Sequence, residues 1–411
     1  MATARLTDVD ALRGFALFGI LIVNATYFAS AFHGSGLPDP AFGSTADLTV
    51  AWLVTWLFET KFYLLFSFLF GYSFTLLRGF AQKAAFLRRL AMLFVIGACH
   101  AVLLFTGDIL TTYAVLGLIL LAAGGLKPRT AVLAAAGILA GVAAIYAALG
   151  WLIAWTEPNA TLDAAAMTAR AYRAAGQLAG DPAQVIGAHL HDLPSTASLL
   201  LLFQAPAALA MFLLGLAAGT RNLLADPMRH RTALRLAQWI GFPVGLAGSA
   251  VYADAAAHGA GTAYEAFAAA IDLVTAPLLA AAYAATVLRI FHTAAGRRVA
   301  AALAPAGRMA LSNYLGQSVV LAVIFTGYGF ALVGRLSPGT VVALCLALYA
   351  IQLALSAAWM RAYAYGPLEW LLRAATRLRW PAWRRSPADQ DRLSRPVSGT
   401  RNAPSSPGSS R

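Results

Sequence analysis

Apolar runs of roughly twenty residues recur along the whole chain, and they constrain its possible folds more than any other feature. The hydrocarbon core of a bilayer is about 30 Å thick, so a spanning helix needs about 20 predominantly apolar residues. Only 11% of the 411 residues are charged, whereas a soluble domain carries about 25%. We therefore predict an all-α polytopic membrane protein with about ten transmembrane helices, near 15–33, 58–77, 90–105, 109–124, 130–153, 198–219, 236–253, 267–290, 309–333 and 340–361.

The basic residues predict how these spans are oriented. Lys and Arg concentrate in the short cytoplasmic loops of membrane proteins. With a cytoplasmic N-terminus, 26 of the 30 Lys and Arg residues fall on the cytoplasmic side, and four do not: Lys61, Arg170, Arg173 and Arg335. Both termini are therefore predicted to be cytoplasmic. The net charge of +13 then reports topology and not nucleic-acid binding.

Two polar segments divide the chain. Residues 154–197 carry four acidic and two basic residues and are predicted to form an extracytoplasmic connection with a helix over 162–178. This connection separates an N-terminal five-helix half (1–153) from a C-terminal five-helix half (198–379). Residues 380–411 are rich in Pro, Ser and Arg without apolar periodicity. Such a composition predicts a disordered cytoplasmic tail.

The first apolar run has two interpretations. Arg5 and Arg13 precede it, as in a secretory signal peptide, but Asp8 and Asp10 lie in what would be the basic region. We predict that the run is retained as the first helix. The two cysteines, Cys99 and Cys345, both lie in apolar runs. Their spacing matches no metal site or disulfide framework, so we expect them to pack simply in the core.

Three polar side chains fall at a similar depth in three different spans. With a rise of about 1.5 Å per residue, Asn24, His100 and Gln317 are all expected near the bilayer midplane. Polar groups at that depth often line a cavity or a substrate pathway. The alternative is that each one joins neighbouring helices by a hydrogen bond.

Asp108 follows a glycine in the short connection after the third span. Asp is a favoured helix N-cap, so a purely structural role is one interpretation. The other is a dyad with His100. A straight helix would separate these two side chains by about 12 Å, so they can meet only if the helix breaks near Thr106 and Gly107. His33, at the outer end of the first span, is an alternative partner for Asp108.

Five motifs resemble one known family. They are Asp10-Ala11-Leu12-Arg13-Gly14 continuing to Asn24; Lys61-Phe62 with Leu65-Phe66-Ser67-Phe68-Leu69-Phe70-Gly71; Gly97 with His100-Ala101 and Gly107-Asp108-Ile109-Leu110; Gly307-Arg308-Met309-Ala310-Leu311-Ser312-Asn313-Tyr314 with Gln317-Ser318; and Gly366-Pro367-Leu368-Glu369-Trp370. On these motifs the chain is identified as a member of the YeiB family (domain of unknown function 418) of bacterial inner-membrane proteins.

The first span is also similar to that of transmembrane acyltransferases such as heparan-alpha-glucosaminide N-acetyltransferase. Those enzymes take an acetyl group from cytosolic acetyl-CoA and acylate a sugar on the far side of the membrane. The resemblance implies acyl-CoA as co-substrate and a cell-envelope glycan or lipid as acceptor. Leu12-Arg13-Gly14 and Asn24 match the motif, and His33 is the nearest counterpart of its catalytic histidine. His100 is the other candidate base.

Acyl transfer from a thioester needs a base and donors aimed at the developing oxyanion. His100, oriented by Asp108, or His33 would supply the base, and Asn24 the donor. The CoA phosphates would meet cations at the cytoplasmic face, although the positive-inside rule also explains those residues. The candidate binding residues are Arg13, Arg88, Arg89, Arg308 and Gln317, with Glu59 and Lys61 facing either a polar acceptor or each other.

A transporter or lipid flippase would explain the same polar groups without chemistry. Pro243 and Pro277, with Asp272 shortly before the latter, indicate the interrupted helices that bind substrates in transporters. A non-catalytic membrane scaffold is a third interpretation, and a homo-oligomer is compatible with all three. Binding of acyl-CoA would separate the enzyme from the other two.

Overall fold

The computed structural model describes residues 7–76, 83–156 and 163–384. Within these ranges the regular structure is helical, and the only β-type pairing is an isolated bridge between Tyr363 and Arg384. The predicted disordered tail lies outside the described residues from position 385 onward. The all-α class is therefore confirmed.

The described chain forms fifteen α-helices. The N-terminal part contains α1 (Thr7–Ala29), α2 (Thr45–Leu57), α3 (Lys61–Leu76), α4 (Lys83–Leu103), α5 (Leu110–Ala123) and α6 (Pro128–Thr156). Two further helices, α7 (Ala164–Leu178) and α8 (Pro182–Leu199), form the connection. The C-terminal part contains α9 (Ala205–Thr220), α10 (Arg231–His258), α11 (Ala263–Phe291), α12 (Gly296–Arg308), α13 (Ala310–Phe325), α14 (Pro338–Ala362) and α15 (Pro367–Arg377).

The membrane-spanning capacity of these helices agrees with a polytopic protein. Among the described residues, eight helices or continuous helix pairs are long and apolar enough to cross a bilayer. A ninth span results if α12 and α13, which meet at a bend of 79°, are taken together. The remaining predicted span, 109–124, falls on α5, which is apolar but has only 14 residues.

Some boundaries differ from the predicted ones. Helices α1 and α4 begin at Thr7 and Lys83, several residues before the apolar runs, because a helix can extend beyond the hydrocarbon layer with charged residues in its first turn. Asp8 and Asp10 suit the positive end of the α1 dipole. The predicted span 309–333 stops as a helix at Phe325, and the chain after it folds into turns.

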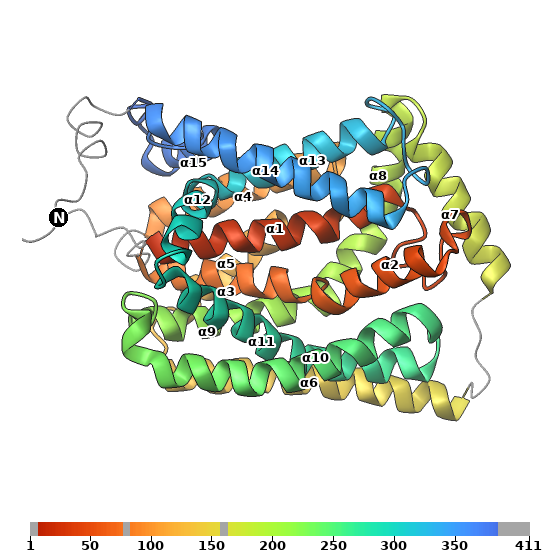
Figure 1. Ribbon diagram of the computed structural model, residues 1–411, viewed down its shortest axis with the longest axis horizontal. Helices are drawn as coiled ribbons and strands as arrows, with labels where there is room; N and C mark the ends of the chain where they lie inside the picture. The colour runs from red at the N-terminus through yellow and green to blue at the C-terminus, as the bar shows by residue number, and fades with distance from the viewer. Residues whose placement is uncertain (1–6, 77–82, 157–162, 385–411) are drawn as a thin grey trace, which may run out of the picture.

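Most of the long helices lie side by side along the long axis of the molecule, with α1 near the middle and α6 along one edge, whereas α7 and α8 are inclined to this axis at one end (Figure 1). The largest helix contacts across the two predicted halves join α3 to α9, α1 to α12, and α6 to both α9 and α11. Gly71 and Gly215 permit the close approach of α3 and α9, because a Cβ at either position would overlap the backbone of the other helix. The two halves therefore share one core.

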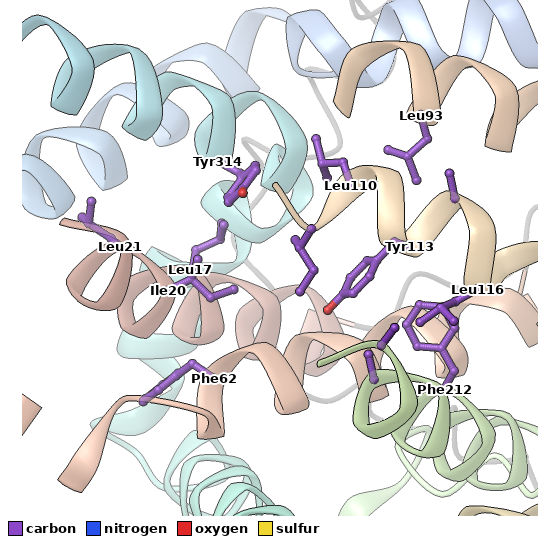
Figure 2. Packing of buried hydrophobic residues seen from close by; sticks show 14 of the residues in the cluster. Leu17, Ile20, Leu21, Phe62, Leu93, Leu110, Tyr113, Leu116, Phe212 and Tyr314 are labelled. Carbon is purple, nitrogen blue, oxygen red and sulfur yellow. The ribbon is translucent and has the colours of Figure 1, made fainter. Parts of the chain in front are cut away.

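Helix α1 contributes to both buried hydrophobic clusters of the protein. Leu17, Ile20 and Leu21 of α1 belong to one cluster with Phe62 of α3 and Tyr314 of α13, and Figure 2 shows these side chains together with Tyr113 and Phe212. By contrast, α6 buries little of its surface, as expected for a helix that faces lipid at the edge of the bundle.

The packed body extends past the predicted tail boundary at residue 380. Trp380 stacks on Trp370 of α15 at a ring-centroid distance of 4.7 Å, and the tilted ring of Trp383 lies 4.3 Å from Trp370. The N–H of Ala364 donates to the carbonyl of Trp383 at 3.0 Å. Aromatic side chains here supply the apolar contacts that the composition of the segment does not predict.

Candidate functional site

His100 and Asp108 form a buried dyad at the end of α4. The helix ends at Leu103, where the N–H groups of Leu104 and Phe105 both donate to the carbonyl of His100 at 2.9 Å. The chain then reverses, and the carboxylate of Asp108 returns to within 2.8 Å of His100 Nδ1. Each residue is 1% exposed. The helix break on which the predicted dyad depended is therefore present.

Asp108 also caps the next helix. Its second oxygen, Oδ2, accepts from the backbone N–H of Thr111 at 2.8 Å and from the Thr111 hydroxyl at 2.9 Å. The two interpretations of Asp108, helix cap and partner of a histidine, are thus both true. Because the cap holds one oxygen, the other is fixed in its direction toward the imidazole.

Gly97 gives the carboxylate its space. A Cβ at this position would lie 2.7 Å from Asp108 Oδ2 and 2.7 Å from the N of Thr111. Real Cβ atoms are not found so close to other heavy atoms, so any larger residue would displace the turn that carries Asp108. Gly97 is a positioning residue of the dyad.

The second ring nitrogen of His100 contacts Ser318. The Ser318 hydroxyl on α13 lies 2.9 Å from His100 Nε2, and it is 1% exposed. A carboxylate, an imidazole and a hydroxyl thus form one continuous hydrogen-bonded chain, which we call the relay cluster (Asp108, His100 and Ser318). No role for Ser318 was predicted from the sequence. The only local signal was its place one helical turn after Tyr314 within a quoted motif.

Aromatic and amide groups surround the relay cluster. The rings of Tyr314 and Phe105 lie 5.2 and 6.3 Å from the His100 ring. The Tyr314 hydroxyl lies beside the side chain of Asn24 on α1 and near Asp108. Asn24 and His100, predicted at one level, are therefore brought into the same region.

Gln317 is not part of this region. Its amide donates to Gln352 Oε1 on α14 at 2.7 Å, and Gln352 in turn donates to the Asn313 carbonyl at 2.9 Å. This is the helix-joining role that the sequence analysis kept as the alternative. Asn24 and His100 lie within six residues of the ends of α1 and α4, toward the side that carries Asp108. The prediction of midplane depth assumed that these two helices begin at residues 15 and 90, whereas they begin at Thr7 and Lys83.

His33 faces Glu59 and not Asp108. Its Nε2 is 4.0 Å from Glu59 Oε2, and its ring meets Tyr27 edge-on at 4.3 Å. The Tyr27 hydroxyl donates to Glu59 Oε1 at 3.2 Å. Burial lowers the pKa of His33, and the Glu59 charge partly opposes this. His33 therefore belongs to a second polar site just beyond the C-terminal end of α1, separate from the relay cluster.

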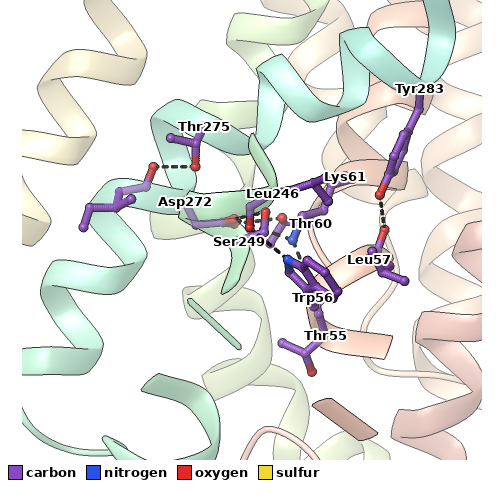
Figure 3. Close-up of polar contacts among 11 residues, drawn as sticks. Thr55, Trp56, Leu57, Thr60, Lys61, Leu246, Ser249, Asp272, Thr275 and Tyr283 are labelled. Carbon is purple, nitrogen blue, oxygen red and sulfur yellow. Dashed lines mark hydrogen bonds and ion pairs between the residues drawn. The ribbon is translucent and has the colours of Figure 1, made fainter. Parts of the chain in front are cut away.

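A second buried cluster joins α3 to α11. Lys61 is 0% exposed, and its ammonium lies 3.6 Å from Asp272 Oδ1 and donates to the Thr55 carbonyl at 3.3 Å. Asp272 accepts from the hydroxyls of Ser249 at 3.0 Å and Thr60 at 2.8 Å (Figure 3). We call this the ion-pair cluster (Lys61, Asp272, Ser249 and Thr60). Lys61 thus faces the bundle interior and not an outer solvent-filled site.

Thr60 holds an unusual backbone conformation in this cluster. Its φ is 69°, in the left-handed region that β-branched residues rarely adopt. It lies in the turn between α2 and α3, and its hydroxyl is bonded to Asp272. Strain of this kind persists only where the surrounding contacts impose it.

The predicted cytoplasmic arginines have different partners. Arg13 forms an ion pair with Asp10 at 2.8 Å and donates to the Ser73 hydroxyl. Arg88 donates twice to the carbonyl of Thr376, at 3.1 and 2.9 Å, and so ties α4 to α15. Arg89 lies within electrostatic range of Arg13, Glu369 and Arg373. Arg308 is half-buried at the bend between α12 and α13.

Glu369 caps the helix that carries Ser318. Its Oε1 accepts from the N–H groups of Leu311 at 2.7 Å and Ser312 at 3.1 Å, and its Oε2 accepts from the Ser312 hydroxyl at 2.6 Å. Burial raises the pKa of this carboxyl, and the hydrogen bonds from Ser312 and Leu311 oppose the shift. Glu369 belongs to one of the five motifs, but its sequence context does not predict this contact, which links α15 to the start of α13.

Comparison with known proteins finds relatives that match nearly the whole chain. The family model "Protein of unknown function (DUF418)" matches residues 218–379. The chain is 32% identical over 401 residues to "Uncharacterized protein YxaH" of Bacillus subtilis (strain 168), covering 92% of this chain and 96% of the relative. It is 27% identical to "Uncharacterized protein YeiB" of Escherichia coli (strain K12), covering 90% and 96%. No solved structure matches significantly.

Proposed function

This chain belongs to the YeiB (DUF418) family of multi-pass membrane proteins, and we propose that it is a transmembrane acyltransferase of the bacterial inner membrane. It would move an acyl group from cytosolic acyl-CoA to a glycan or lipid acceptor on the outer side. The observation that carries the proposal is the relay cluster, in which His100 is held between a carboxylate and a hydroxyl at 2.8 and 2.9 Å.

The dyad has the properties of a general base. A carboxylate that accepts from Nδ1 fixes the imidazole tautomer, so that Nε2 carries the free lone pair. Asp108 is itself held by Thr111, which limits its rotation. In the transfer, His100 takes the proton of the attacking hydroxyl, the C–S bond breaks, and the proton passes to the departing thiolate of CoA.

Asn24 and Tyr314 are the candidate oxyanion donors. The Tyr314 ring on α13 lies 5.2 Å from the His100 ring, and the polar ends of Tyr314 and Asn24 lie together. In the proposed reaction one of them donates to the oxyanion that develops on the acyl carbonyl. Loss of a single oxyanion donor typically costs about 10²–10³ in rate.

The donor's phosphates would bind at the opposite end of the bundle. Arg13, Arg89 and Arg308 lie near the start of α1, the start of α4 and the bend before α13. Arg88 is the weaker candidate, because its guanidinium already bonds the Thr376 carbonyl. The long pantetheine arm of CoA would connect this end to the relay cluster.

The test is calorimetric titration of the purified full chain with acetyl-CoA and with palmitoyl-CoA, together with release of the CoA thiol in cell-envelope preparations. We expect saturable binding of one donor and transfer of its acyl group. His100→Ala should keep the affinity within a few-fold and lose turnover, whereas His258→Ala, at an exposed surface position, should change neither. If no acyl-CoA binds the wild-type protein, the acyltransferase proposal is wrong.

One observation favours a transporter as the second candidate. The ion-pair cluster places two opposite charges inside a helical bundle, where ionisable residues commonly mark a substrate or proton pathway. Asp272 lies five residues before Pro277 within α11. Substrate movement without covalent change, abolished by Asp272→Asn, would support this candidate over acyl transfer.

A further inference from the structure

The nitrogen of His100 that would act as base already faces a hydroxyl of this chain. His100 Nε2 is 2.9 Å from Ser318 Oγ, and the other ring nitrogen is held by Asp108. The hydroxyl that the dyad is placed to deprotonate is therefore that of Ser318. An acceptor from outside would first have to displace it.

The order of the three groups matches a known chemical arrangement. Carboxylate, imidazole and serine hydroxyl in hydrogen-bonded sequence form the activated nucleophile of serine hydrolases, an arrangement that recurs on unrelated folds and is recognised by geometry. Here the three groups come from α13 and from the two sides of the α4–α5 break. A serine hydroxyl is unreactive alone and becomes a nucleophile when an adjacent base accepts its proton.

We infer that Ser318 is the nucleophile of this protein and that the acyl group is carried on its oxygen between donor and acceptor. This inference rests on the proposed acyl transfer. A covalent carrier would let the acyl group leave CoA before the acceptor arrives, so that the two substrates need not occupy the buried site together.

The two half-reactions balance. In the first, Ser318 Oγ attacks the thioester carbonyl, His100 takes the hydroxyl proton, the C–S bond breaks and the proton passes to the CoA thiolate. In the second, His100 takes the proton of an acceptor hydroxyl, that oxygen attacks the seryl ester, and the proton returns to Ser318 Oγ. The net products are an acylated acceptor and free CoA thiol.

The alternative is a purely structural role, in which the Ser318 hydroxyl only provides a hydrogen-bond partner for His100. Serine in apolar helices usually bonds the carbonyl four residues earlier, and Ser318 Oγ does donate to the Tyr314 carbonyl, but at the long distance of 3.4 Å, against 2.9 Å to His100 Nε2. The hydroxyl thus lies closer to the imidazole than to its own helix. A structural role and a nucleophilic role differ in one observable, which is a covalent acyl-serine.

The experiment incubates the purified full chain with radiolabelled acetyl-CoA, and separately with labelled palmitoyl-CoA, without acceptor. We expect one acyl group to become bound per chain, with release of one equivalent of CoA thiol. The bond should survive neutral hydroxylamine, because it is an oxygen ester, and peptide mapping should place it on Ser318. His100→Ala should slow labelling by about 10²–10⁴-fold.

Two serine variants and a matched control make the result specific. Ser318→Ala should lose the label while keeping acyl-CoA affinity within a few-fold. Ser318→Cys should retain a label that neutral hydroxylamine now removes, because a thioester replaces the ester; this variant guards against a loss caused by misfolding. Ser356→Ala is the control, since Ser356 is equally buried on α14 and bonds Asn313 at 3.0 Å.

The outcomes separate the two proposals. Acyl transfer without a covalent label, with turnover retained by Ser318→Ala, would overturn the nucleophile and leave His100 as base for direct transfer. Absence of acyl-CoA binding and of thiol release in the wild-type chain would overturn the acyltransferase itself, and the nucleophile with it.

Discussion

The relay cluster and the ion-pair cluster are built by the same topological device but differ in their chemistry. In each cluster, a break between two N-terminal helices places polar groups against a helix of the C-terminal half. In the relay cluster the break between α4 and α5 faces α13, and in the ion-pair cluster the break between α2 and α3 faces α11. The relay cluster has hydrogen bonds of 2.8 and 2.9 Å that join a carboxylate, an imidazole and a hydroxyl. In the ion-pair cluster, opposite charges are 3.6 Å apart and hydroxyls hold the carboxylate.

The difference in chemistry indicates a different role for each cluster. A hydrogen-bonded histidine can change its protonation state during a reaction, which suits it to catalysis. A buried Lys–Asp pair is weak support for stability, but the removal of one partner leaves an uncompensated charge in a low-dielectric interior. We therefore assign the chemistry to the relay cluster and helix positioning to the ion-pair cluster.

The largest expected effect is on turnover. Asp108→Asn keeps the shape of the side chain but removes the charge that orients His100 and stabilises its protonated form. We expect acyl transfer to fall by about 10²–10⁴-fold, with donor affinity changed only a few-fold and a modest loss of thermal stability. The measurement is CoA thiol release beside a calorimetric titration. Full turnover in this variant would show that the dyad is structural.

The same substitution in the other cluster should act on stability. Asp272→Asn leaves the Lys61 ammonium buried without its counter-charge, and breaking a buried pair typically costs about 3–5 kcal/mol. Denaturation in detergent micelles measures the loss. The double variant Lys61→Met, Asp272→Leu should recover much of it, because no unpaired charge remains. If Asp272→Asn instead abolishes turnover at unchanged stability, the ion-pair cluster takes part in the chemistry, and its assignment to helix positioning is wrong.

Gly97→Ala should produce an intermediate effect. The added methyl group would overlap Asp108 Oδ2 and the N of Thr111, so the turn must shift away from His100. A displacement of about 1 Å at a reacting group can cost about 10²-fold in rate. Gly137→Ala is the matched control, because a Cβ there meets no atom within 4 Å. Equal turnover of the two variants would contradict the positioning role of Gly97.

The smallest effect concerns His33, which belongs to neither cluster. Burial lowers its pKa below the ordinary value, which is about 6.5. As the pH falls below that value, the unfolded chain binds this proton before the folded one does, so the stability contribution decreases until the pH passes the folded pKa. His33→Gln should flatten this part of the pH–stability curve. A curve unchanged by the substitution would mean that His33 titrates normally.

The local sequence was sufficient for most of the fold. Runs of apolar residues determine spanning helices whatever their neighbours, because a backbone in hydrocarbon must satisfy its own hydrogen bonds. Asn24, His100 and Asp108 could be chosen from the sequence as candidate site residues, because polar side chains are costly in apolar surroundings. The glycine before Asp108 indicated a break between the third and fourth spans, although α4 itself already ends at Leu103. Arg88 and Gln317 could be placed on their helices, but not given their partners.

Only the tertiary structure decided which polar groups meet. Ser318 lies 218 residues from His100, and Thr60 lies 212 residues from Asp272, so no periodicity or spacing connects them. Ser318 is unremarkable in sequence, because a serine in an apolar helix can bond its own backbone. Its contact with His100 depends on the rotation of α13 and on the bend between α12 and α13, where Glu369 caps the start of α13 from another helix. Side-chain type is a local property of the chain, whereas the pairing of buried polar groups is set by helix packing.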